Sequence, residues 1–250
     1  MEFAFIRSTR GGTVNGRVVD TRFATNIVQA KAAGLRVGIY HFARWDLSTP
    51  GVLTGLNSPA DEAAHFLSIA GPHITDGSLR PVLDLEADSS DPTAGTRFTR
   101  AQLTDWALAF CNEIVKAKGP SALPFVYING SFANDEIDSR LNVYPLWFAR
   151  YGANGDPLTT GQPLATTTFP NIYGAWNPTG SLTNHPWAFW QYSNTGSVPG
   201  IIGNVDLNVF NNERFLSIDA FTIASVIPEP TTLALLMLPT LPLLRRPPRN

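Results

Sequence analysis

The sequence contains one cysteine, Cys111, in 250 residues. A single thiol excludes an internal disulfide framework and a multi-cysteine zinc site. Histidine is almost as scarce, and His41, His65, His73 and His185 show no metal-like spacing to one another or to carboxylates. No glycine-rich phosphate loop follows a predicted strand either. We therefore expect neither a metal nor another cofactor.

Charged residues make up only 15% of the chain, and neither sign dominates. Eighteen Lys and Arg oppose 20 Asp and Glu, which gives a net charge of −2. Nucleic-acid binding depends on clustered basic side chains that displace counterions, so we expect no nucleic-acid partner. A hydrophobic fraction of 44% excludes a disordered chain. The composition fits a globular protein that acts on a neutral polymer.

Seven short β-rich runs bounded by turn residues predict strands. They lie at residues 3–7, 37–42, 81–86, 125–129, 146–151, 171–176 and 188–192. Helical patterns at residues 21–33, 61–70 and 99–118 separate several of these strands, and each ends before a glycine that suits a helix C-cap. Alternating strands and helices indicate a mainly parallel sheet. With one further strand upstream the count reaches eight, so we predict an α/β fold, an irregular TIM-like β/α barrel.

The third helical pattern carries two further signals. Thr99 and Gln102 form a capping-box pattern at its start. Cys111 falls on the same helix face as Phe110 and Ile114, so we expect a core residue rather than a nucleophile.

The two ends of the chain differ from the body. Met1 and Glu2 run straight into a strand-like segment with no signal region before it, so we expect the first strand to be missing from this chain. At the other end, Pro228-Glu229-Pro230, an apolar run over residues 231–244 and Arg245-Arg246 resemble a PEP-CTERM sorting signal. A frayed hydrophobic tail or a weak membrane anchor is the alternative.

The sorting-signal resemblance implies a location and a partner. It implies export to the cell envelope or the exterior of a Gram-negative bacterium, processing by an exosortase-type enzyme, and transient membrane contact through the tail. We accordingly divide the chain into a catalytic domain at residues 1–215, a linker at 216–227 and a sorting or anchor tail at 228–250.

Asp84 and Glu86 end a predicted strand that begins with the apolar residues after Arg80. Their spacing of two places both carboxyls on one strand face, at the end where a parallel barrel collects catalytic groups. Their charges interact, so at least one pKa should rise. Glycoside hydrolysis needs such a pair, one protonated acid and one carboxylate. A solvated strand end is the alternative reading of the same tripeptide.

Aromatic side chains on or beside the predicted strands add a second argument, because ring faces stack well on sugar C–H surfaces. We expect most of the aromatic residues to lie in the core and some to meet a substrate. For His41 a substrate contact and a buried, hydrogen-bonded position remain open. The residues expected to bind substrate are Tyr40, His41, Tyr127, Trp147, Trp190 and Tyr192.

Stretches spread over about residues 3–212 resemble family 25 of the glycoside hydrolases, the Chalaropsis-type lysozymes. Their order and spacing match as well as their residues. They are Phe3-Ala-Phe-Ile-Arg-Ser-Thr-Arg-Gly11, Asp20-x-x-Phe23-x-x-Asn26, Ala33-Gly-Leu-Arg-Val-Gly-Ile-Tyr-His-Phe42, Pro81-Val-Leu-Asp-Leu-Glu86, Val126-Tyr-Ile-Asn-Gly130, Leu146-Trp-Phe-Ala-Arg-Tyr151, Trp190-Gln-Tyr-Ser-x-x-Gly196, Val198-Pro-Gly-Ile201 and Val205-Asp-Leu-Asn208.

The resemblance implies hydrolysis of the β-1,4 bond between N-acetylmuramic acid and N-acetylglucosamine in peptidoglycan or a related aminosugar polymer. It implies that Glu86 is the general acid and that Asp84 is its partner carboxylate, either the nucleophile or the group that steadies the substrate's acetamido as it attacks. Asp206 matches a further acidic residue of the groove, with a strand-end cap as its alternative role. The resemblance also implies another active-site Asp on the family's first strand, and we expect that strand to be missing from this chain.

Two other functions remain open on the sequence. One is a catalytically inactive peptidoglycan- or glycan-binding envelope protein, and the other is a structural surface protein displayed through the tail. Asp84, Glu86 and Asp206 occur together, which favours the enzyme.

Overall fold

The computed structural model describes residues 1–13, 16–86, 97–151, 174–181 and 185–224. Eight strands occur in this part: β1 (Phe3–Arg10), β2 (Val18–Val19), β3 (Arg36–Phe42), β4 (Val82–Asp84), β5 (Phe125–Asn129), β6 (Leu146–Ala149), β7 (Trp187–Gly196) and β8 (Val205–Phe210). The α-helices are α1 (Phe23–Ala32), α2 (Pro59–Ala70), α4 (Arg100–Lys118) and α5 (Gly130–Asp135).

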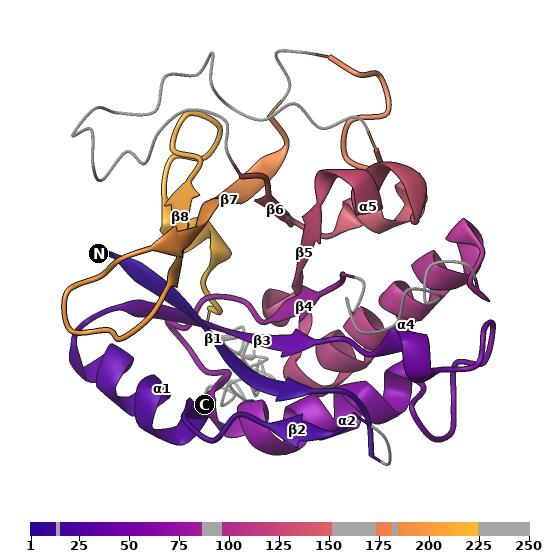
Figure 1. The fold of residues 1–250 in the computed structure, drawn as a ribbon, viewed down its shortest axis with the longest axis horizontal. Coiled ribbons are helices and arrows are strands. Elements are labelled where there is room, and N and C mark those ends of the chain that lie inside the picture. Colours follow the sequence, from indigo (N-terminus) through magenta and orange to yellow (C-terminus); the bar gives the residue numbers. More distant parts are fainter. Residues whose placement is uncertain (14–15, 87–96, 152–173, 182–184, 225–250) are drawn as a thin grey trace, which may run out of the picture.

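All eight strands form one sheet in the order β2-β1-β3-β4-β5-β6-β7-β8. The pairs from β1 through β7 are parallel, and only the outer pairs with β2 and β8 are antiparallel. Figure 1 shows the sheet curling, with α1, α2 and α4 along its outer side and α5 beside β5. No strand in the described residues joins β1 to β8. The α/β prediction of an irregular, TIM-like β/α barrel is confirmed as a curled, incompletely closed sheet.

Most predicted elements are present, and the exceptions have local causes. The three predicted helices are present as α1, α2 and α4, and α4 begins with the predicted capping box. Gly71 follows α2 as predicted, but it has a right-handed φ of −50° and continues into a 3₁₀ turn. The strand predicted at residues 171–176 is wrong over its described part, because Gly174 to Trp176 form a turn. Strand β8 is absent from the predicted set and pairs with β7.

The larger core lies between the sheet and the helices. One face of each strand supplies apolar residues such as Ile39, Leu83 and Val126, and they meet the buried face of α2 and α4. Cys111 is fully buried there, which confirms the expectation of a core thiol. Because alternate side chains of a strand point to opposite faces, the residues between these apolar ones point to the concave face of the sheet.

The smaller core fills the concave face of the sheet and is largely aromatic. Phe5 stacks on Trp147 with ring centroids 4.2 Å apart, and Phe189 packs edge-on to Phe5 at 5.0 Å. Gly38 leaves the room that this needs, because a Cβ there would lie 2.4 Å from the Phe5 ring. Aromatic packing therefore closes the interior of the sheet below its upper rim.

The predicted linker, residues 216–227, is described up to residue 224 and packs against the sheet. Ile218, Phe221 and Ile223 are buried, and Ile223 exchanges backbone hydrogen bonds with Gly77 and Ser78 at 2.9 and 2.8 Å. The packed body thus includes this segment. The predicted tail, residues 228–250, lies outside the described residues, and its sorting role stays a prediction. Within the described part of the chain, no helix is both long and apolar enough to cross a membrane.

Candidate active site

On the concave face of β1, β4 and β5, a polar side chain lies two residues after a residue of the buried apolar layer. Since side chains two residues apart share a strand face, Phe5 leads to Arg7, Val82 to Asp84, and Phe125 to Tyr127. The carboxyl ends of parallel strands meet at one rim, so these groups gather there. The lower layer is buried, and the upper layer holds the polar candidate residues.

The carboxyl end of β4 is held from both sides by backbone hydrogen bonds. The Asp84 carbonyl accepts from the Ala43 amide at 3.0 Å, and the Leu85 amide donates to the Tyr127 carbonyl at 3.0 Å. The Glu86 carbonyl accepts the indole N–H of Trp45 at 3.0 Å. These hydrogen bonds hold the backbone at Asp84 and Glu86 in place.

Asp84 is 7% exposed, whereas Glu86 is half-buried. Burial raises the pKa of Asp84 well above 3.8, and the neighbouring charge of Glu86 raises it further. The buried Oδ1 atom of Asp84 has no hydrogen-bond partner in the described part of the chain that would favour the ionised form. The predicted rise of a pKa in this pair is confirmed. The pair holds a proton to a higher pH than an isolated carboxyl would, which is the state needed for acid catalysis.

Asp206 belongs to β8 and lies at the exposed rim. Shielding from water raises its pKa, and a hydrogen bond from Gln191 opposes that rise. Asp206 also acts on Asp84, because its charge raises the pKa of Asp84. The structure therefore brings the three carboxylates predicted from the sequence into one electrostatic group.

A cation faces this group from β1. The charge of Arg7 lowers the pKa of Asp84 and of Tyr40, which places the guanidinium within interaction range of both. Arg7 is itself held by Asp20, with Nη2 3.1 Å from Oδ2. The Tyr40 hydroxyl has a raised pKa because it is buried and lies near the charge of Asp84. Arg7 supplies a positive charge close to the buried carboxyl.

The residues predicted to bind substrate occupy different depths. Tyr40 and Tyr192 are half-buried, whereas Tyr127 is 7%, Trp147 5% and Trp190 2% exposed. The two indoles donate inward, from Trp147 to Asn208 Oδ1 at 2.8 Å and from Trp190 to the Arg150 carbonyl at 3.0 Å. The structure places both indoles in the packed layers that support the rim.

His41 has no exposed surface and lies beneath the rim. Its Nδ1 is 2.8 Å from Thr9 Oγ1, and its Nε2 is 2.8 Å from Glu62 Oε2. Of the two positions left open by the sequence, the structure shows the buried, hydrogen-bonded one.

Several residues of the site do not appear in the sequence-based set. Gln191 is buried and its Oε1 accepts from the hydroxyls of Tyr127 and Tyr151 at 2.7 and 2.6 Å. Tyr151 is 44% exposed and faces the rim. Arg7 and Gln191 lie within stretches that resemble family 25, but no local pattern marks a residue whose partners are on other strands.

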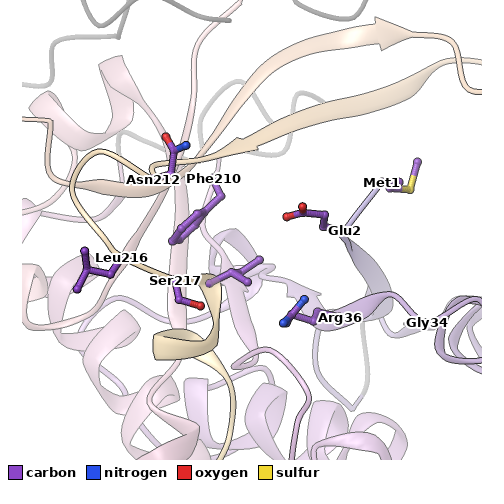
Figure 2. Close-up of a pocket in the computed structure, with 9 residues that line it drawn as sticks. Met1, Glu2, Gly34, Arg36, Phe210, Asn212, Leu216 and Ser217 are labelled. Carbon is purple, nitrogen blue, oxygen red and sulfur yellow. The ribbon is translucent and has the colours of Figure 1, made fainter.

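Two further features of the described residues are relevant to other sites, namely potential metal ligands and a surface hollow. In the part of the chain that the structure describes, no three His, Cys, Asp or Glu residues are grouped so that they could hold a metal. A hollow of about 480 Å³ opens at the opposite end of the sheet, where β1 and β3 begin and β8 ends (Figure 2). Glu2 and Arg36 face Phe210 and Ser217 across it in Figure 2. It lies away from the carboxylate rim.

A curled β/α sheet with paired carboxyls at the end of a central strand and a third carboxylate on the same rim is an arrangement that suits glycoside hydrolysis. Comparison with known proteins defines the group more closely. The chain belongs to family 25 of the glycosyl hydrolases, whose family model matches residues 1–201.

Two relatives illustrate the match in sequence. Lysozyme M1 of Streptomyces globisporus is 30% identical over 215 residues, which cover 84% of this chain and 60% of the relative. The autolytic lysozyme of Clostridium acetobutylicum is 27% identical over 212 residues, which cover 84% of this chain and 49% of the relative. The chain thus spans about half to three fifths of the length of these relatives.

Solved structures agree on the fold. The bacterial lysozyme of Streptomyces coelicolor has a TM-score of 0.61 and 27% identity, over 88% of this chain and 87% of that one. The family 25 lysozyme of Aspergillus fumigatus has a TM-score of 0.62 and 24% identity, over 88% of each chain.

Proposed function

We propose that this protein is a peptidoglycan hydrolase, a muramidase that cleaves the β-1,4 bond between N-acetylmuramic acid and N-acetylglucosamine. The observation that carries the proposal is the carboxyl pair at the end of β4, in which burial of Asp84 and the charge of Glu86 keep a proton on the pair. Membership of family 25 and the lysozymes among its relatives support the choice of substrate.

In this account Glu86 donates a proton to the glycosidic oxygen as the bond to the sugar carbon breaks. Glu86 is the more accessible member of the pair and can reach a bound glycan. Asp84 is ionised in this state and either attacks the sugar carbon or steadies the substrate's acetamido as it attacks. A water molecule, which gives its proton to Glu86, then attacks the same carbon and releases the sugar, and both routes retain the configuration. The Arg7 charge favours the ionised form of Asp84. Asp206 binds or orients the sugar from the opposite side of the rim.

The test compares the release of reducing ends from purified peptidoglycan by the wild-type chain and by Glu86→Gln. Loss of a general acid lowers the rate by about 10²–10⁴-fold, so we expect the variant to be folded and nearly inactive. Glu113→Gln is the matched control, because Glu113 lies on α4 in an exposed pair with Lys116 and should leave the rate unchanged.

A folded Glu86→Gln variant with wild-type activity would contradict the proposal. Binding of peptidoglycan without turnover by the wild-type chain would instead favour the catalytically inactive glycan-binding protein.

A further inference from the structure

Glu62 is a carboxyl residue with no exposed surface, on the face of α2 that packs into the larger core. Its neighbours Ala63 and Phe66 on the same helix are fully buried apolar residues. Burying a carboxyl costs free energy, so an apolar side chain would suit this position better unless the carboxyl has specific partners. The partners of Glu62 therefore indicate its role.

The two carboxyl oxygens of Glu62 meet one backbone amide and one imidazole. The Arg44 amide donates to Oε1 at 3.2 Å and to Oε2 at 3.0 Å. Oε2 also lies 2.8 Å from His41 Nε2, and the other ring nitrogen of His41 lies 2.8 Å from Thr9 Oγ1. Thr9 and His41 are buried as well. This hydrogen-bonded group connects α2 with β1, with β3 and with the segment that follows β3.

Residues 43–45 form the segment that follows β3, and they hold the end of β4. The first of them donates its amide hydrogen to the Asp84 carbonyl at 3.0 Å, and the indole of Trp45 donates to the Glu86 carbonyl at 3.0 Å. The residue between these two donors is the one whose amide donates to Glu62. Three successive residues thus connect the buried carboxyl on α2 to two carbonyls at the strand end.

We propose that Glu62 is a positioning residue, which fixes the 43–45 segment and through it the end of β4 that carries Asp84 and Glu86. The proposal rests on the proposed hydrolase function of the same rim. An amide that loses its acceptor favours a backbone shift toward another partner or water. Since Glu62 has no exposed surface, it does not touch a bound glycan. Its loss should therefore lower kcat and leave KM unchanged.

The test compares kcat and KM for soluble peptidoglycan fragments in the wild-type chain, Glu62→Leu and Glu62→Gln. Leucine keeps most of the volume and removes both acceptor oxygens, so we expect kcat to fall about tenfold at an unchanged KM. Glutamine keeps one oxygen that can accept the Arg44 amide, so Glu62→Gln should retain a kcat close to that of the wild-type chain. A loss of kcat in folded Glu62→Gln as large as in Glu62→Leu would overturn the proposal.

Thr104→Val is the matched control. Thr104 is fully buried on α4, and its Oγ1 accepts the amide of Asp138, which caps the 3₁₀ turn before β6, at 2.9 Å. Valine keeps the shape and removes the acceptor, so this variant should lose stability and keep its kcat. An equal fall of kcat in Thr104→Val and Glu62→Leu, or wild-type kcat in folded Glu62→Leu, would also overturn the proposal.

Hydrogen exchange in the wild-type chain tests the contact without any variant. The Arg44 amide should exchange slowly with deuterium, because it is held by Glu62. This protection should persist in Glu62→Gln and be lost in Glu62→Leu. Fast exchange at Arg44 in the folded wild-type chain would overturn the proposal. Loss of protection in Glu62→Leu without peptidoglycan turnover by the wild-type chain would support the hold on the 43–45 segment and contradict the hydrolase function.

Discussion

His41 and Glu62 form a fully buried pair beneath the rim, and burial acts on their pKa values in opposite directions. It lowers the pKa of His41 from 6.5 to about 3 and raises that of Glu62 well above 4.5. Below pH 6.5 the unfolded histidine takes up a proton that the folded one refuses, so stability falls as pH falls. Above pH 4.5 the unfolded glutamate releases a proton that the folded one keeps, so stability falls as pH rises.

Between pH 4.5 and 6.5 the two effects cancel, because the folded and unfolded pairs each hold one proton. The substitution Glu62→Gln removes the effect of the glutamate and leaves that of His41. We expect the free energy of unfolding of the variant, relative to wild type, to fall with decreasing pH in that window by up to ~1.4 kcal/mol per pH unit. Urea unfolding across the window measures it, with Glu113→Gln as the exposed control. Parallel curves for wild type and Glu62→Gln would contradict the assignment.

At the scale of elements, the segment after β3 packs into the core and holds the end of β4, where Asp84 and Glu86 lie. Trp45 is fully buried, packs edge-on against Phe98 with centroids 5.3 Å apart, and donates its indole N–H to the Glu86 carbonyl. Arg44 and Asp46 flank it in a bidentate ion pair with bonds of 2.8 and 2.7 Å. The backbone at Glu86, the proposed general acid, is thus held by a loop that follows a different strand.

We expect Trp45→Phe to lower the rate of peptidoglycan hydrolysis several-fold, because the freed Glu86 carbonyl no longer fixes the acid. Losing a buried donor also costs about 1–3 kcal/mol of stability. Trp176→Phe is the matched control, since Trp176 is also buried and donates its indole N–H to a backbone carbonyl, that of Tyr144, at 2.8 Å, before the start of β6. Both variants should lose similar stability. Equal rates for the two would refute a positioning role for Trp45.

Sequence periodicity predicted the elements that are buried on one or both faces. Helix α4 shows this best, since its capping box and its apolar face both appear in the structure. The same reasoning missed β8 as a strand, because its Val205 to Phe210 pattern is half exposed and its stability comes from pairing with β7. Edge strands and turns depend on distant partners, which a local pattern does not contain.

Over the whole molecule, the site is a consequence of sheet curvature. The Asp84 and Glu86 pair could be predicted because both carboxyls lie on one strand end. Gln191 and Arg7 could not, because their neighbours Tyr127, Tyr151 and Asp84 come from other parts of the chain. The buried aromatic layer lies beneath the polar rim that holds the three carboxylates. A polar rim of this kind suits a neutral polymer with many hydroxyls.

Identification of the bond that is cut tests this account most directly. Purified peptidoglycan is digested with the wild-type chain, the products are reduced with borohydride, and their new ends are identified by mass spectrometry. A muramidase leaves N-acetylmuramic acid at the reducing end, so we expect N-acetylmuramitol in the reduced products and its absence with Glu86→Gln. Reduced N-acetylglucosamine ends, or no new ends from the folded wild-type chain, would contradict the account.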